Sequence, residues 1–197
     1  MADRVLVRAS DIVGLPVVTI DSGEDIAEIR DVVYDGRQHA LVGFTLKKRS
    51  WWGGNLPSML TASRVAAIGS DAVMIESEAE LIEQDKAPSS LTDKAGSHPV
   101  IGTGVLSAGG LRLGTIAGVI VETGDTPRAV GYEITSSDAS KGDTTMFVPI
   151  SAEMALSDDN LIVPADVTPF VGNDLAGFGA VIETFNQSKA ADSEVEA

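Results

Sequence analysis

Residues 26–35 read Ile-Ala-Glu-Ile-Arg-Asp-Val-Val-Tyr-Asp, and residues 113–122 read Leu-Gly-Thr-Ile-Ala-Gly-Val-Ile-Val-Glu. At this offset of 87 positions, apolar residues fall on apolar residues and Asp35 falls on Glu122. Both stretches are rich in β-branched residues, which favour extended strands. The pair therefore predicts one strand that occurs twice in the chain.

The repeat continues on both sides of this strand. With one residue inserted, three further segments match: Val42–Phe44 with Val130–Tyr132, Met59–Thr61 with Phe147–Pro149, and Ser70–Val73 with Asp158–Leu161. A period near 88 is too long for a solenoid unit and suits a duplicated domain. We predict one domain at residues 1–85 and a second at residues 99–185.

Each copy has the composition of a small β domain. Strands are predicted at Leu15–Ile20, Ile29–Tyr34 and Ala40–Lys47, with tight turns at Ser22–Asp25 and Ala108–Gly110. Short helical turns are expected at Ser10–Val13, Thr61–Ala67 and Ser151–Leu156. The predicted fold class is all-β, with two small β-barrels in tandem and only short helical turns.

Two segments lack the features of a folded domain. Residues 86–98 are polar, contain Pro88 and are followed directly by Pro99, so they are predicted to be a linker. Residues 186–197 are small, polar and acidic, and we expect them to be a disordered tail.

Composition narrows the class of protein. The 197 residues include 14 Lys or Arg and 29 Asp or Glu, a net charge of −15, which argues against direct binding to nucleic acid. The absence of cysteine removes disulfides and thiolate chemistry and fits a reducing compartment. Neither a signal peptide nor an apolar run long enough to span a membrane is recognisable, so we expect a cytoplasmic protein.

Residues with catalytic or ligand-binding potential are sparse. His39 and His98 have no second His or Cys at metal-ligand spacing and are interpreted as surface residues. The glycines at positions 102, 104, 109, 110 and 114 lack the strand-to-helix context of a phosphate loop, which favours turn and bulge glycines. No nucleophile has a candidate base. The prediction is a protein without enzymatic activity, cofactor or metal.

One segment stands apart chemically from the rest of the chain. Residues 47–55 follow a predicted strand and hold three of the basic residues and both tryptophans: Lys47, Lys48, Arg49, Trp51 and Trp52. The corresponding segment of the second copy, residues 136–143, is polar and slightly acidic. The repeated framework therefore does not require this basic and aromatic chemistry.

Two interpretations of the basic and aromatic segment remain open. Trp and Arg are favoured in binding hot spots, so the segment is a candidate site for an acidic protein partner, a membrane surface or a single-stranded nucleic acid. Alternatively, Trp51 and Trp52 fold back over an open barrel end or are buried between two copies of the chain.

The repeated unit resembles the PRC-barrel domain. The likeness lies in the order of the segments Ser10–Val17, Ile26–Asp35, Leu41–Phe44, Ala62–Gly69 and Asp71–Ile75. The second copy keeps this order from Val100 to Val163, so the resemblance covers about four-fifths of the chain. The family includes the cytoplasmic part of the photosynthetic reaction-centre H subunit and the C-terminal half of a ribosome maturation factor. The resemblance implies small barrels that dock onto partners, and no shared chemistry.

These observations favour a cytosolic adaptor or scaffold that binds a protein partner or self-assembles. One alternative is a ribosome-associated maturation factor that acts through a ribosomal protein, since such proteins are basic and this chain is acidic. Another is a peripheral membrane-associated assembly factor, held weakly through the tryptophans and basic residues.

Overall fold

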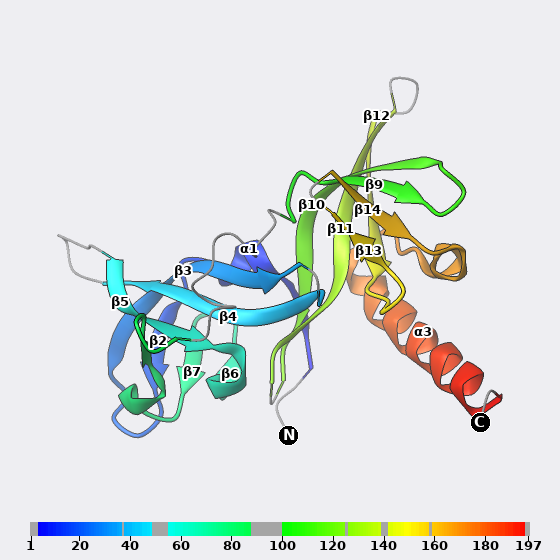
Figure 1. The fold of residues 1–197 in the computed structure, drawn as a ribbon. Coiled ribbons are helices and arrows are strands. Elements are labelled where there is room, and N and C mark those ends of the chain that lie inside the picture. Colours follow the sequence, from blue (N-terminus) through cyan, green and yellow to red (C-terminus); the bar gives the residue numbers. More distant parts are fainter. Residues whose placement is uncertain are drawn as a thin grey trace. The chain divides into compact units, whose positions relative to one another are not determined.

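The computed structural model describes residues 4–36, 38–48, 55–87, 100–124, 126–138, 142–157 and 159–195. The chain is mostly β, with few helices (Figure 1). It divides into two compact units. The first comprises Met1–His98 with Val121–Ala129, and the second comprises Pro99–Ile120 with Val130–Ala197. The predicted linker lies almost entirely outside the described residues.

The first unit contains one sheet in the order β6-β7-β2-β3-β4-β5-β8. All neighbours in this sheet are antiparallel except β2 and β7, which are parallel. Its elements are β1 (Leu6–Arg8), α1 (Ala9–Ile12), β2 (Pro16–Thr19), β3 (Asp25–Asp35), β4 (Ala40–Lys47), β5 (Asn55–Thr61), η1 (Ala62–Arg64), β6 (Ala67–Ile68), β7 (Val73–Ile75), η2 (Glu78–Glu80) and β8 (Ile82–Glu83).

The core of the first unit follows from strand alternation. Ala27 and Ile29 on β3 are fully buried, as are Phe44 and Leu46 on β4, to within 1% exposure. Successive side chains of a strand point to opposite faces, so these residues share one face of the sheet. The bounds predicted for β4 are confirmed, β3 contains the predicted strand Ile29–Tyr34, and β2 lies within the predicted strand Leu15–Ile20.

The second unit repeats the same strand order, as β13-β14-β9-β10-β11-β12. The parallel pair is again in the equivalent place, between β14 and β9. Its elements are β9 (Gly104–Ser107), β10 (Arg112–Glu122), β11 (Arg128–Asp138), β12 (Gly142–Pro149), β13 (Ala155–Leu156), β14 (Asn160–Val163), η3 (Ala165–Phe170) and α3 (Leu175–Val195). In the described residues, the end strands of each sheet do not pair with each other.

Equivalent turns in the two units are built on glycine. Gly14 and Gly102 have φ angles of 91° and 90°, which L side chains rarely adopt. Their N–H groups donate to the carbonyl oxygens of Ile29 and Ile116, at 2.9 and 2.7 Å. The prediction of turn and bulge glycines in the second copy is confirmed for Gly102, Gly109 and Gly110 in turns and for Gly114, where β10 changes register, but Gly104 begins strand β9.

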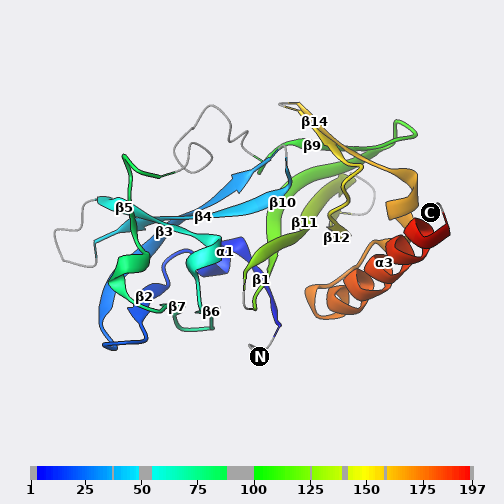
Figure 2. The ribbon, with the colours of Figure 1, turned by 60° about the horizontal axis from the view of Figure 1, so that its bottom comes forward.

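Helix α3 was not predicted. It lies against β12 and η3 (Figures 1 and 2). Phe178, Ile182 and Phe185 are buried along one side of it, at the spacing of successive helical turns. The expected disordered tail at residues 186–197 is therefore wrong for residues 186–195. Two side chains of its first residues hold it: Lys189 bonds to Glu153 and Asp166, and Ser188 donates to the Phe185 carbonyl.

A second prediction to correct is the helical turn at Ser151–Leu156. These residues form a turn followed by β13, which pairs with β14. The Met154 N–H donates to the Ser151 carbonyl at 3.1 Å, and the Ser151 hydroxyl accepts from the Glu153 N–H at 3.3 Å. Ser151 thus stabilises a turn rather than the start of a helix.

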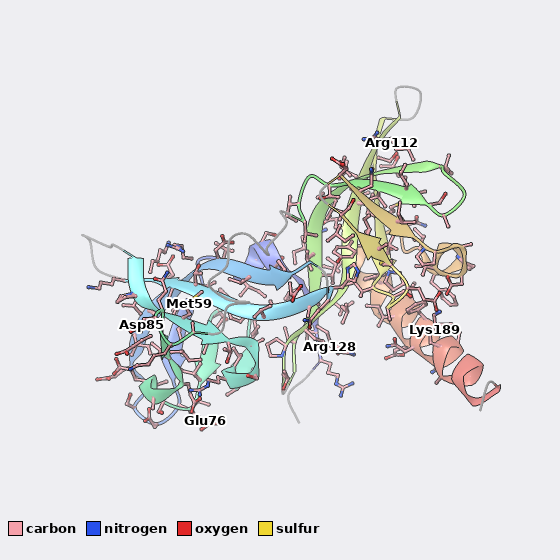
Figure 3. All side chains as sticks on the ribbon, viewed as in Figure 1. Met59, Glu76, Asp85, Arg112, Arg128 and Lys189 are labelled. Carbon is pink, nitrogen blue, oxygen red and sulfur yellow. The ribbon has the colours of Figure 1, made fainter. Side chains whose placement is uncertain are left out.

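The segment between β10 and β11 belongs to the first unit, although both strands lie mainly in the second. The Thr123 N–H donates to the Val5 carbonyl at 2.8 Å, and the Val5 N–H donates to the Thr123 hydroxyl at 3.1 Å. Glu122 and Arg128 form an ion pair at 2.7 Å in the same segment (Figure 3). The chain therefore returns to the first unit after it has begun the second.

Candidate partner-binding site at the β4–β5 hairpin

The basic and aromatic segment connects two paired strands. Lys47 at the end of β4 lies opposite Asn55 at the start of β5, so residues 48–54 join neighbouring strand ends. Arg49, Trp51 and Trp52 lie outside the described residues. The described part of the candidate site is its base, which we call the hairpin base and define as Glu28, Arg30, Thr45, Lys47 and Lys48.

Lys47 takes part in a cross-strand ion pair. Its Nζ lies 2.5 Å from Oε1 of Glu28, the residue opposite it on β3. The two side chains are 42% and 24% exposed, and a pair of this kind contributes at most about 1 kcal/mol. Because Glu28 balances its charge, Lys47 acts mainly by fixing the strand ends from which the hairpin leaves.

Arg30 is a member of the hairpin base that the sequence analysis missed. The β3–β4 register shifts between Ile29 and Asp31, so Arg30 is the extra residue of a bulge. Its Nε donates to the Thr45 hydroxyl at 3.2 Å, and the side chain is exposed. The sequence holds a signal for this: strict alternation from the buried Ile29 would point Asp31 into the core.

The hairpin base carries exposed positive charge. Lys48 and Arg30 are exposed, whereas the charge of Lys47 is balanced by Glu28. In the parts of the chain that the structure describes, no group of His, Cys, Asp and Glu is arranged to hold a metal ion. Lys48 thus begins a loop whose sequence adds Arg49 and two tryptophans, and Arg30 lies on the neighbouring strand β3.

The histidines do not contribute to this site. His39 lies in the β3–β4 turn with a φ of 51° and is 9% exposed, so its interpretation as a surface residue is wrong. The turn folds back because the Gln38 N–H donates to the Asp35 carboxylate at 3.2 Å, and His39 follows directly. His98 lies outside the described residues.

Among the described residues, no helix, α3 included, combines the length and the apolar composition needed to cross a bilayer.

Comparison with known families identifies the first unit. Residues 5–82 match the family model of the PRC-barrel domain, so the chain contains a PRC-barrel domain. The match runs from the residue before β1 to the first residue of β8, and it includes the hairpin. It covers less of the chain than the four-fifths that the resemblance suggested. None of the curated proteins matches the chain.

Proposed function

We propose that the chain is a non-enzymatic, cytoplasmic adaptor or scaffold, built from two PRC-type barrels, that binds a protein partner through the β4–β5 hairpin. A PRC-barrel domain indicates a role in protein interaction or assembly in general. The proposal adds a location for that role on this chain and a chemical character for the partner.

The case for a second PRC-type barrel rests on topology. Apart from β8 in the first sheet and β1 beside β10 in the second, the sheets have the same strand order, and each has a parallel pair at the equivalent position. The positive-φ glycines Gly14 and Gly102 recur, as do Gly23 and Gly110 at the next turn. Such agreement in sheet order and turn geometry is what a duplicated domain produces.

The case for the hairpin rests on where the two units differ. In the second unit, β11 and β12 pair out to Asp138 and Gly142, and only residues 139–141 connect them. In the first unit, residues 48–54 connect β4 and β5 and carry the basic and aromatic side chains. Because the same framework forms without this chemistry, the chemistry is available for binding.

The partner that fits this site has an acidic surface with an apolar recess. Lys48 and Arg30 supply exposed positive charge on a chain whose net charge is −15. Charge of one sign on an oppositely charged background orients a partner and raises its association rate. Tryptophan then contributes the apolar contact that dominates the energy of typical hot spots.

The first experiment is native affinity capture followed by mass spectrometry, with wild type and Trp51→Ser/Trp52→Ser as baits. A matched control is Leu111→Ser, which removes an apolar side chain that is 67% exposed on the second unit. We expect a partner that wild type and L111S retain and the double variant loses. Equal retention by all three folded baits would contradict the proposal.

Charge variants give a second test with the captured partner. Lys48→Gln removes an exposed charge and should weaken binding about tenfold at low salt, the equivalent of about 1.4 kcal/mol. Lys47→Gln is the control, because Glu28 already balances that charge and its loss should change affinity little. The same loss in both variants would argue against Lys48 as a contact.

A further inference from the structure

The outer edges of the equivalent strands β5 and β12 differ between the two units. On β5 the edge is covered by β8, which pairs Ser58 with Glu83 and Met59 with Ile82. The Gln84 N–H also donates to the Pro57 carbonyl at 2.8 Å. Pro57 itself has no N–H to offer, which is one of the ways in which proteins close an edge strand.

On the outer edge of β12, only one described residue forms backbone hydrogen bonds with another segment. Phe147 exchanges two backbone hydrogen bonds with Gly172, both at 2.8 Å. Because backbone direction alternates along a strand, the N–H and C=O groups of Thr145 and Asp143 also point away from β11. Among the described residues, none pairs with these four groups, and β12 ends its sheet (Figure 1).

The difference between the two strand edges corresponds to a difference in sequence at one aligned position. The repeat aligns Phe147 with Met59 and therefore Thr145 with Pro57, so a proline stands where the edge is covered and a threonine where it is open. Thr144 and Thr145 are both exposed. An open edge with a donor and an acceptor at alternate positions is a template for another strand.

We propose that the open edge of β12 pairs antiparallel with the same edge of a second copy of the chain. Asp143 of each copy lies opposite Thr145 of the other, and the two-fold axis passes between the two Thr144 residues. In this register all four outward backbone groups of each copy are paired.

The register follows from the groups that are available. Centring the axis on Thr145 would place Asp143 opposite Phe147, whose outward groups Gly172 already occupies. With the axis at Thr144, Asp143 of each copy lies opposite Thr145 of the other, so the outward backbone groups of one strand meet outward backbone groups of the other. The strand therefore complements itself.

The pairing is expected to be weak and to respond to salt in a characteristic way. Only four hydrogen bonds form, and each copy carries a net charge of −15, so the copies repel each other. Screening reduces this repulsion, and dimer formation should increase with salt concentration. Docking through the hairpin should instead decrease with salt, so the two proposals fail or succeed independently.

Disulfide trapping tests the register directly, because the chain has no cysteine of its own. In Thr144→Cys the two Cα atoms would lie about 4.5 Å apart, as in a non-hydrogen-bonded antiparallel pair, which is within disulfide range. In the neighbouring control Thr145→Cys they would be about 8 Å apart, which is too far.

We expect Thr144→Cys to form a covalent dimer under mild oxidation at about 1 mM protein, at least tenfold faster than Thr145→Cys. Adding Thr145→Pro, which copies Pro57 and removes only an outward N–H, should abolish the dimer while circular dichroism shows a folded protein. Equal trapping of both cysteines, no trapping in either folded variant, or trapping that survives the proline would each overturn the proposal.

Discussion

Gly131 lies at a position where no other residue fits. A Cβ there would be 2.5 Å from the Phe178 ring and 3.0 Å from the Val148 carbonyl oxygen. The equivalent Gly43 would place a Cβ 2.2 Å from the Leu60 carbonyl oxygen. The close backbone approach is thus common to both units, and the aromatic ring is an addition of the second.

We predict that Gly131→Ala lowers the free energy of unfolding of the second unit by about 2 kcal/mol or more, because the ring and strand must both shift. Urea unfolding followed by circular dichroism measures this. Gly109→Ala is the control, since its Cβ would meet nothing closer than 3.8 Å and should change stability by less than about 0.5 kcal/mol. Equal effects of the two substitutions would exclude the steric explanation.

Within the candidate site, the sequence predicted the positions of some residues but not their contacts. Lys47 and Lys48 lie at the strand end where they were expected, but the balancing of Lys47 by Glu28 depends on strand register. Arg30 joins them only because of a bulge. Register and bulges are set by pairing across the sheet, which periodicity along one strand does not record.

Among the elements, α3 depends on its packing and on one ionic cluster. Lys189 lies on α3 with its Nζ 2.6 Å from Asp166 and 2.8 Å from Glu153 (Figure 3). The hydrogen bond from Lys189 holds the pKa of the Asp166 carboxyl below its ordinary value. The same bonds, first from Asp166 and then from Glu153, raise the pKa of Lys189.

The sign of the resulting pH dependence follows from the lowered pKa of Asp166. Its contribution to stability is complete above the ordinary carboxyl pKa of about 4 and is lost as pH falls through the lower, folded value. We predict that amide exchange in residues 178–190 accelerates as pH falls below about 4, relative to the intrinsic rate. Lys189→Gln should remove this dependence, with a stability loss under about 1 kcal/mol because the groups are partly exposed.

The packing of α3 gives a larger effect. Phe178 is fully buried and contacts Phe147 at a ring-centroid distance of 5.6 Å. We predict that Phe178→Ala lowers the free energy of unfolding of the second unit by about 3–5 kcal/mol. Thermal unfolding should show this, and Glu183→Ala, an exposed position on the same helix, should leave the transition almost unchanged. A similar result for both would mean that the helix is not held by its buried side.

The strands were predicted more successfully than the helix for a physical reason. Runs of β-branched residues and turn glycines are recognisable in short stretches of sequence, and both bounds of β4 were predicted correctly. In α3 the apolar residues Phe178, Ile182 and Phe185 are diluted by small and polar residues, so the amphipathic pattern is faint. Asp174 did offer a signal, since its carboxylate accepts from the Gly177 N–H at 2.7 Å as a helix cap does.

For the whole molecule, the two units cannot be separated by one cut. A chain that ends at residue 98 keeps every strand of the first sheet but loses Val121–Ala129 and the hydrogen bonds of Thr123 to Val5. We predict that amide exchange at Val5 in this shortened chain is at least tenfold faster than in the full chain, because the N–H loses its partner. Unchanged protection of Val5 would show that the returning segment is dispensable.

The organisation into two domains could be predicted from the sequence, because the two duplicated copies can be aligned with each other. The return of Val121–Ala129 to the first unit could not be predicted, because it does not change the offset between the aligned copies. The open edge of β12 was hidden for a similar reason. An edge is open only if no other strand pairs with it, and this is known only from the sheet order. The sequence alone therefore does not show why a threonine at the position of Pro57 matters.

The returning segment also has a consequence for the order of events during synthesis. Roughly thirty residues separate His98 from Ala129, and translation at about 5–20 residues per second adds them in about 1.5 to 6 s. During that interval the nascent first unit has its whole sheet but lacks its last segment. The first unit can therefore complete its fold only after synthesis of the second unit has begun, so its maturation depends on continued translation.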